Sequence, residues 1–456
     1  MRNFPGTEPF FRISGLITVL LLALTLCGCD ITLDDIFTRQ DEKEVSHKDA
    51  APSNTAISVI DINGDVHETK VNVIEDTEAE DNGAEEDGTG NLSERSLVQV
   101  AANMHLSDDS NYAYNNLTET GRKCYEEIYA ILTDCLSKVR LTTKDPDEVD
   151  LAFRAVMVDH PEIFYVKGYS IGKYMSGDRL KKIVFSGTYT NSPEEIAIKT
   201  RTVDDYVQKV IDGCPEDAGD FEKIKYVYDY LIRNNVYDTE SENNQNILSV
   251  VENGRTVCQG YTKMMQLILT RMNIFCTLVN GRACGRNGVP DREELEDAAN
   301  AQWGGHVWNI VKCNGMYYNI DVTWGDATIT LMNSDGTRSG GIDVNYEFFL
   351  VDDEELVGTH DPEPVVRMPR CNTMEDNYYR HMGQYFTGID DEQLKRAFER
   401  SLSEGESHVF IKAASPEVFD ELEDHLFSNE YVFKYLGRTN VRYVEFAERN
   451  LIMISL

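Results

Sequence analysis

The sequence predicts an α+β fold with a small α/β unit at its C-terminal end. A helix-period stripe of apolar residues begins directly after Cys258. Two strand-like runs flank Asn314-Gly315, which is a strong hairpin signal. From about residue 390, helix-like and strand-like segments alternate again. We therefore expect a helix bearing Cys258 to pack on an antiparallel sheet, and residues 388–456 to form a small C-terminal α/β domain.

Length and charge bound the class of protein. The chain has 456 residues, a length that suggests two to three domains. It carries 79 acidic and 43 basic residues, a formal net charge of −36. Because phosphate binding needs a positive surface, this charge argues against nucleic acid as a partner.

The N-terminus has the pattern of a targeting segment. Arg2 and Arg12 precede an apolar run at 16–26 that ends in "LCGC", whose last residue is Cys29. A positive region before a short apolar run is typical of a signal peptide, and the run is shorter than a membrane-spanning helix. "L-x-G-C" resembles a bacterial lipobox, which predicts a lipoprotein signal peptide at 1–29 with Cys29 as the lipidated residue. An ordinary signal peptide or an uncleaved anchor is the alternative.

Residues 30–95 are predicted to be an acidic, disordered tether. They hold 19 acidic and 5 basic residues, and the run at 75–91 has neither an aromatic nor a basic residue. Such a composition cannot bury enough apolar surface to fold. Within it, residues 57–74 alternate apolar and polar positions around Asn63-Gly64, which predicts a hairpin.

The folded part is predicted to begin at residue 96, with an N-terminal α/β region at 96–220 that packs on the core at 221–387. Helical stripes are expected over 121–140 and 221–235, a helix stopped by Pro161, a strand after it, and another strand at 180–189. In the C-terminal domain we expect helices at 391–403 and 416–427, and strands in "HVFIKA", "YVFKYLG", "RYVEFA" and "LIMISL".

Eight cysteines follow the signal peptide, at positions 124, 135, 214, 258, 276, 284, 313 and 371. An oxidising exterior permits disulfides, but the spacing is irregular and forms no metal-binding pattern. Cys124 and Cys135 are a candidate pair. Most of the others are predicted to be buried small apolar residues.

Cys258 is the candidate nucleophile. It lies at the start of a predicted helix, where unpaired amides and the helix dipole favour a thiolate. A cysteine at such a place is also a common packing residue, so the case depends on a partner.

The predicted hairpin at 303–326 supplies that partner. If Asn314-Gly315 forms the turn, then His306, Trp308, Asp321 and Thr323 share one face, with Asp321 diagonally across from His306. A carboxylate beside a histidine fixes its tautomer and leaves the other nitrogen free to take a thiol proton. Separately, a core histidine and a salt-bridge aspartate are the plainer interpretations. Together the residues indicate Cys/His/Asp chemistry.

Three motifs resemble the bacterial transglutaminase-like superfamily, within the papain-like fold: "TVCQGYTKMMQLILTRMNI", "GGHVWNIV" and "YYNIDVTWGD". The resemblance implies Cys258 as nucleophile, His306 as base and Asp321 as orienting acid. It covers about 220–330, and more loosely 150–386 through "NNQNILSVV", "NYEFFLV" and "CNTMEDNYYRHMG". These flanks are like the exported forms of Gram-positive bacteria. Thr262 stands where such motifs often carry alanine.

The resemblance also implies supporting residues. Gln245 is similar in placement to an oxyanion-stabilising glutamine, with a loop-capping amide as the alternative. Trp308, Trp324 and Tyr261 are expected to wall the cleft, or else to be ordinary core aromatics. The insertion at 282–305 is expected to be a lid or a passive surface loop. No metal and no other cofactor is expected, since no acidic calcium loop is present.

Three functions follow from these observations. The first is a lipid-anchored acyl-transfer enzyme acting through a thioester on Cys258, a cysteine protease or amidase slightly ahead of a transglutaminase. The second is a non-catalytic module that binds peptides or cell-wall material in the same cleft. The third is a structural surface lipoprotein in which residues 388–456 interact with partners. The intact Cys/His/Asp set favours the first.

Overall fold

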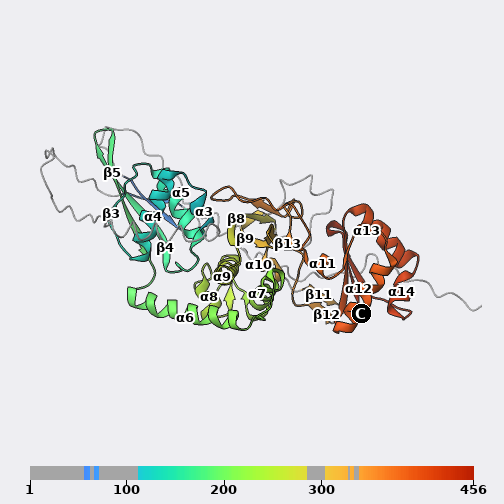
Figure 1. Cartoon of the computed structure of the whole chain (residues 1–456). Helices are drawn as coiled ribbons and strands as arrows, with labels where there is room; N and C mark the ends of the chain where they lie inside the picture. The colour runs from blue at the N-terminus through green and yellow to red at the C-terminus, as the bar shows by residue number, and fades with distance from the viewer. Residues whose placement is uncertain (1–55, 62–65, 71–110, 285–302, 327–328, 333–337) are drawn as a thin grey trace, which may run out of the picture.

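The computed structural model describes residues 56–61, 66–70, 111–284, 303–326, 329–332 and 338–456. Three regions follow one another along the chain: an N-terminal sheet with its helices, a central sheet beside α7 and α9, and a C-terminal sheet with its own helices (Figure 1). The predicted signal peptide, Cys29, most of the tether and residues 285–302 of the 282–305 insertion lie outside the described residues. Within the described ranges, no helix combines the length and the apolar character needed to cross a membrane.

The N-terminal region is a five-stranded sheet of order β2-β1-β4-β5-β3 with helices packed on it. Its strands are β1 (Ala56–Asp61), β2 (Val66–Lys70), β3 (Val139–Arg140), β4 (Val166–Ser176) and β5 (Arg179–Tyr189). Its helices are α3 (Tyr112–Asn115), α4 (Glu119–Thr133) and α5 (Pro146–Asp159). Helix α5 stops before Pro161, as predicted. Helix α4 ends earlier than the predicted residue 140, because Cys135 and Lys138 adopt left-handed backbone conformations.

The strands of the hairpin predicted at 57–74 are present. β1 pairs antiparallel with β2, while the turn residues between them lie outside the described part. β1 also pairs with β4 and so extends the N-terminal sheet. These strands fall within the segment predicted to be a tether, at the place where a hairpin was expected, because an alternating stretch can pair with an existing sheet edge.

The central region holds the helix and the sheet predicted around Cys258. Its helices are α6 (Pro193–Asp212), α7 (Asp220–Asn234), α8 (Ile247–Glu252), α9 (Cys258–Arg271) and α10 (Val322–Gly325). Its main strands are β8 (Cys276–Cys284), β9 (Trp303–Cys313), β10 (Met316–Ile320), β13 (Phe349–Val351) and β14 (His360–Pro362). Short pairs are β6 (Val236–Tyr237) with β7 (Arg255–Thr256), and β11 (Ile329–Met332) with β12 (Arg338–Ile342). The main sheet has the order β13-β10-β9-β8-β14 and is antiparallel throughout, and α9 packs against β8 and β9.

The C-terminal region is an α/β unit with the sheet order β15-β16-β18-β17. Its strands are β15 (Tyr385–Phe386), β16 (His408–Ala413), β17 (Tyr443–Phe446) and β18 (Leu451–Ser455). Its helices are α12 (Asp391–Glu404), α13 (Pro416–Glu423), the π-helix η2 (Asp424–Ser428), α14 (Tyr431–Leu436) and the 3-10 helix η3 (Ala447–Arg449), preceded by α11 (Tyr378–His381). The sheet begins before the predicted boundary at residue 388, since β15 pairs parallel with β16.

One predicted strand of this unit is a helix. The segment "YVFKYLG" forms α14, which packs against α12 and η2. Six residues rich in tyrosine and phenylalanine fit a strand by composition, but Gly437 in the left-handed conformation ends a helix here, and Val432 is buried in the C-terminal core.

Packing joins the regions. Buried residues of the N-terminal and central regions form one continuous core, in which Phe153 and Tyr169 belong to the same cluster as Tyr228 and Ile268. The C-terminal unit has its own core, but its Leu451 belongs to the larger cluster. The central sheet is buried on both faces: Leu278 and Val311 belong to the larger cluster, and Val279 and Ile310 belong to a third one.

None of the eight cysteines from Cys124 to Cys371, all of which lie in the described ranges, forms a disulfide. The suggested pairing of Cys124 with Cys135 is wrong: Cys124 is buried among apolar residues, whereas Cys135 lies beyond the end of α4. The prediction that most of these cysteines are buried is confirmed, and Cys258 is one of three that remain partly exposed.

Candidate active site

Helix α9 begins at Cys258, as predicted. The preceding residue, Val257, is in an extended conformation and has no side chain that can cap the helix. As the first helical residue, Cys258 has no intrahelical acceptor for its N–H, and none of the described residues accepts it. The thiol therefore lies beside an unpaired amide at the positive end of a 14-residue helix.

A close approach of two segments shapes the start of α9. The hydroxyl of Thr256 donates to the carbonyl of Asn244 at 3.1 Å, which holds residues 244–246 against the helix. A Cβ atom on Gly260 would lie 1.9 Å from the Thr256 hydroxyl and 3.1 Å from the carbonyl of Asn246. Residue 260 must therefore be glycine for the segment 244–246 to lie this close to the start of α9.

The predicted hairpin has the predicted register. Met316 faces Cys313 across the turn, and Asn314 and Gly315 take φ values of 50° and 86°, as a tight two-residue turn needs. The ladder between β9 and β10 ends where Ile320 faces Asn309. Asp321 therefore does not pair with Trp308, as a continued ladder of the same register would require. Instead the chain leaves the sheet and Asp321 caps α10, with Oδ1 accepting from two backbone amides.

The histidine and the aspartate of the predicted set are hydrogen-bonded. Nε2 of His306 lies 2.7 Å from Oδ2 of Asp321, and both side chains are almost fully buried. Because Nε2 faces the carboxylate, Nδ1 is the nitrogen left to face the thiol. A side-chain hydrogen bond joins His306 to Cys258. The structure therefore brings the three residues together in one chain of contacts.

Electrostatics favour an ionised pair. Burial opposes a charged imidazole, but the Asp321 carboxylate and the hydrogen bonds to Asp321 and Cys258 outweigh it and raise the pKa of His306 to about 10. Burial likewise opposes the carboxylate, yet His306 and a second histidine, His360, hold the pKa of Asp321 well below its usual range. Both shifts favour the imidazolium form of His306 beside the ionised carboxylate of Asp321.

His360 is a site residue that the sequence analysis missed. Its Nε2 lies 3.1 Å from Oδ2 of Asp321, the same oxygen that His306 contacts. It stands at the start of β14, which pairs with β8 as an edge strand of the sheet. In the sequence, His360 is marked only by the Asp-Pro that follows it. The residues around it show no strand or helix periodicity that would place it on the sheet of His306.

Gln245 is held near the cysteine by a second missed residue. Lys263, on α9, donates from Nζ to the backbone carbonyl of Gln245 at 3.2 Å. The Lys263 side chain is nearly buried, which lowers its pKa to about 8, and the charge of Cys258 counteracts part of that shift. The side-chain amide of Gln245 is half-buried and makes no hydrogen bond to any described residue. A lysine beside Met264 and Met265 in an apolar stripe was a signal that sequence analysis could have used.

The three aromatic residues expected to wall the cleft are largely core residues. Tyr261 has no exposed surface and donates to Asp326 at 2.7 Å, so it does not line a cleft. Trp308 is 1% exposed and donates to Asn319. Trp324 is 8% exposed, its ring nitrogen has no partner among the described residues, and its ring lies 6.1 Å from that of His306. Only Trp324 keeps some surface near the site. For Tyr261 the alternative interpretation, an ordinary core aromatic, is correct.

His306, Asp321 and His360 also form a group with metal-ligating atoms. Both histidines, however, approach the same oxygen at hydrogen-bonding distances of 2.7 and 3.1 Å. Ligands bound at about 2.1 Å around one ion lie roughly 3 Å or more apart and leave room between them for the ion. Shared donation to one carboxylate oxygen accounts for this geometry, and we derive no chemistry from a metal here.

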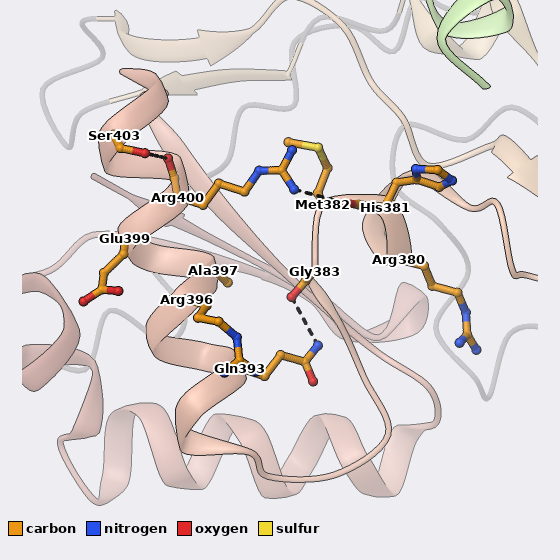
Figure 2. A pocket seen from close by; sticks show the side chains of 10 residues that line it. All are labelled: Arg380, His381, Met382, Gly383, Gln393, Arg396, Ala397, Glu399, Arg400 and Ser403. Atoms are coloured by element: carbon orange, nitrogen blue, oxygen red, sulfur yellow. Dashed lines mark hydrogen bonds between the residues drawn. The ribbon is translucent and has the colours of Figure 1, made fainter. Parts of the chain in front are cut away.

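Figure 2 shows a separate hollow, lined by residues 380–383 and by α12. Two of its arginines have partners: Arg400 donates to Glu404 at 2.9 Å and to the His381 carbonyl at 3.1 Å, and Arg380 lies over the ring of Tyr385. Gln393 closes one side by donating to the carbonyl of Gly383. The hollow lies between α12 and the turn after α11, and its lining does not include Cys258, His306 or Asp321.

Comparison with known proteins identifies the central region. Residues 204–322 match the sequence profile of the Transglutaminase-like superfamily, a range that includes Cys258, His306 and Asp321. A curated relative, the kyphoscoliosis peptidase of Mus musculus, is 19% identical over 223 residues. That match covers 46% of this chain and 32% of the relative, so the chain spans about a third of that protein. The predicted resemblance is confirmed for this domain.

Two solved structures are similar over part of their length. One is a crystal structure of a TGase, with 11% identity and a TM-score of 0.24 over 43% of this chain and 53% of that chain. The other is a proposed cysteine protease from Cytophaga hutchinsonii, with 9% identity and a TM-score of 0.21 over 45% of this chain and 79% of that one. The mixed α+β architecture predicted from the sequence is the one observed. The narrower prediction of an exported bacterial lipoprotein form stays a prediction.

Proposed function

We propose that this protein is a cysteine-dependent acyl-transfer enzyme acting on protein or peptide amides. The observation that carries the proposal is the chain of contacts from Cys258 through His306 to Asp321, with an unpaired amide at Cys258. A buried carboxylate orients the imidazole, and the imidazole activates the thiol. The transglutaminase-like match over the same residues supports this assignment.

The reaction follows from these groups. The Cys258 thiolate attacks the carbonyl carbon, and the oxyanion that forms accepts hydrogen bonds from the Cys258 amide and the side chain of Gln245. The C–N bond then breaks while His306 gives its proton to the departing amine. His306 next takes a proton from water or from a second amine, which attacks the thioester and releases the thiolate.

We favour hydrolysis by water over cross-linking by an amine, since water is abundant and no described residue selects an amine. Of the two activities, we therefore propose a cysteine protease or amidase first and a transglutaminase second. Incubation with glutamine-containing peptides, with and without a primary amine, separates the two. Released ammonia without amine incorporation is the expected result, and preferred incorporation of the amine would reverse the order.

The direct test of the site is the alkylation of Cys258 against pH, followed by mass spectrometry in the full chain. We expect reaction with iodoacetamide to reach its midpoint well below about 8.5, the value for a free thiol, and to move upward in His306→Ala. Cys214, also partly exposed, serves as an internal reference in the same digest. An ordinary midpoint that His306→Ala leaves unchanged would contradict the enzyme and favour a binding module.

We also propose export and lipid attachment through Cys29, which the sequence pattern alone supports. Metabolic labelling with a fatty acid in a bacterial host should label the full chain and not Cys29→Ala. Equal labelling of both would contradict the lipoprotein assignment. A Cys27→Ala variant is the matched control, because Cys27 lies two residues away in the same apolar segment.

A further inference from the structure

The Asp321 carboxylate accepts four hydrogen bonds. Oδ1 accepts the backbone amides of Thr323 and Trp324, at 2.8 and 3.0 Å. Oδ2 accepts hydrogen bonds from Nε2 of His306 at 2.7 Å and from Nε2 of His360 at 3.1 Å. A Cys/His/Asp mechanism needs only one of the two histidines, so the second donor requires an explanation.

The neighbours of His360 define its tautomer. Burial lowers its pKa, so the ring is neutral at neutral pH and carries one proton. Nδ1 lies 2.9 Å from the hydroxyl of Thr359. The other acceptor within reach of that hydroxyl, the carbonyl of Leu356, already receives the amides of Thr359 and His360. Because the ionised Asp321 carboxylate only accepts hydrogen bonds, the ring proton lies on Nε2, facing Asp321. Nδ1 is then an acceptor for the Thr359 hydroxyl, which is also placed to donate to the carbonyl of Leu356 at 3.1 Å.

We infer that His360 is a positioning residue that limits the basicity of His306 by sharing Oδ2 of Asp321, an assignment that rests on the proposed function. The relay runs from the Thr359 hydroxyl through His360 to Asp321, and from there through His306 to Cys258. The Nε2–H of neutral His360 donates to the Asp321 carboxylate and so stabilises part of its negative charge. The carboxylate then stabilises the imidazolium form of His306 less strongly.

The direction of the effect can be derived. The His360 hydrogen bond is stronger when His306 is neutral, because the carboxylate then carries its full, unshared charge. Removing the bond destabilises the neutral state of His306 more than the imidazolium. Loss of the His360 donor is thus expected to keep His306 protonated to higher pH.

Among the described residues, the relay also has Tyr228 beside Asp321 and Lys263 beside Cys258. The groups that act on His306 are Asp321 and Cys258, and those that act on His360 are Asp321 and His306. Arg282 and Asp361 on the adjoining strands pair with each other at the exposed surface. The alternative is that His360 only fills space among Trp308, Trp324 and Phe348, whose rings lie about it at 4.8 to 5.0 Å.

The test uses iodoacetate, an anionic alkylating agent. Its reaction with Cys258 rises as the thiolate forms and falls when His306 loses the positive charge that attracts the reagent, which gives a bell-shaped profile. His360→Phe keeps an aromatic ring without a donor, and His360→Gln keeps an N–H near the place of Nε2. Thr359→Val removes the hydroxyl and leaves His360 in place, which covers the case in which His360→Phe does not fold.

We expect the alkaline limb to move up by about half a pH unit or more in His360→Phe, less in Thr359→Val, and least in His360→Gln. The pH profile for alkylation by iodoacetamide, which is uncharged, should have no alkaline limb. An alkaline limb that stays in place or moves down in the Phe and Val variants overturns the inference and leaves the proposed function standing.

A second measurement separates the two hypotheses if the wild-type profile has no bell shape. In Cys258→Ala, ring-labelled histidine is titrated by NMR, and the His306 signal is identified by its loss in His306→Gln. A higher His306 pKa after adding His360→Phe supports the inference even where the enzyme proposal fails. An equal or lower pKa overturns it.

Discussion

Nε2 of His306 lies 2.7 Å from Oδ2 of Asp321, and the two side chains are 2% and 1% exposed. A buried ion pair is stable only where further hydrogen bonds satisfy its remaining atoms. Here Asp321 receives two backbone amides and a second histidine. The pair is therefore the electrostatic centre of the site, and most of the predictions below depend on it.

Asp321→Asn should abolish most of the reactivity of Cys258. Asparagine keeps the shape of the side chain but removes the charge that raises the pKa of His306. We expect turnover to fall by about 100- to 10,000-fold, as for other triads that lose the orienting carboxylate. The control is Asp376→Asn, since Asp376 is also nearly buried and accepts from Tyr318 at 3.0 Å. A similar loss in both variants would mean a general defect of folding.

The pair should also make stability depend on pH. The pKa of His306 is raised from about 6.5 to about 10, so its contribution is complete below about pH 6.5 and disappears as pH rises toward 10. The pKa of Asp321 is depressed, so its contribution is present above about pH 4 and is lost at more acid pH. The free energy of unfolding of wild type minus that of His306→Gln should fall by a few kcal/mol, on the order of the shift, between pH 6.5 and 10. A constant difference in denaturant titrations would contradict this.

Local patterns predicted the core of the site because each pattern determines a local geometry. The Asn314-Gly315 turn sets the register of β9 against β10, and the apolar stripe after Cys258 sets the start of α9. The spacing therefore brought Asp321 to His306 correctly. It could not show that the ladder ends at Ile320, because the capping of α10 competes with the strand.

The remaining parts of the site depend on contacts between distant segments. His360 reaches Asp321 only because β14 pairs with β8, and Tyr261 is buried because its hydroxyl finds Asp326, 65 residues away. For the same reason the sequence does not distinguish α14 from a strand: its six residues suit either structure, and packing against α12 and η2 selects the helix. Single-sequence periodicity contains no information on such partners.

Gln245→Ala should separate chemistry from thiol reactivity. An oxyanion forms during acyl transfer but not during alkylation by iodoacetamide. We expect turnover to fall about 100- to 1,000-fold, the cost of losing one oxyanion donor, while the rate of Cys258 alkylation stays within about twofold. Gln208→Ala, on the exposed side of α6, is the matched control. Equal losses in both assays would assign Gln245 to holding the loop and not to the oxyanion.

Lys263→Met should lower the reactivity of Cys258 at neutral pH and not at alkaline pH. The buried ammonium has a pKa of about 8, so it is largely charged at pH 6.5 and largely neutral at pH 9.5. Its charge favours the thiolate, and losing it should slow alkylation about 3- to 10-fold at pH 6.5, with near equality at pH 9.5. Lys395→Met, on the exposed face of α12, should change neither rate. If Lys263 only tethers the carbonyl of Gln245, the variant will be slower by the same factor at both pH values, because a misplaced loop does not titrate.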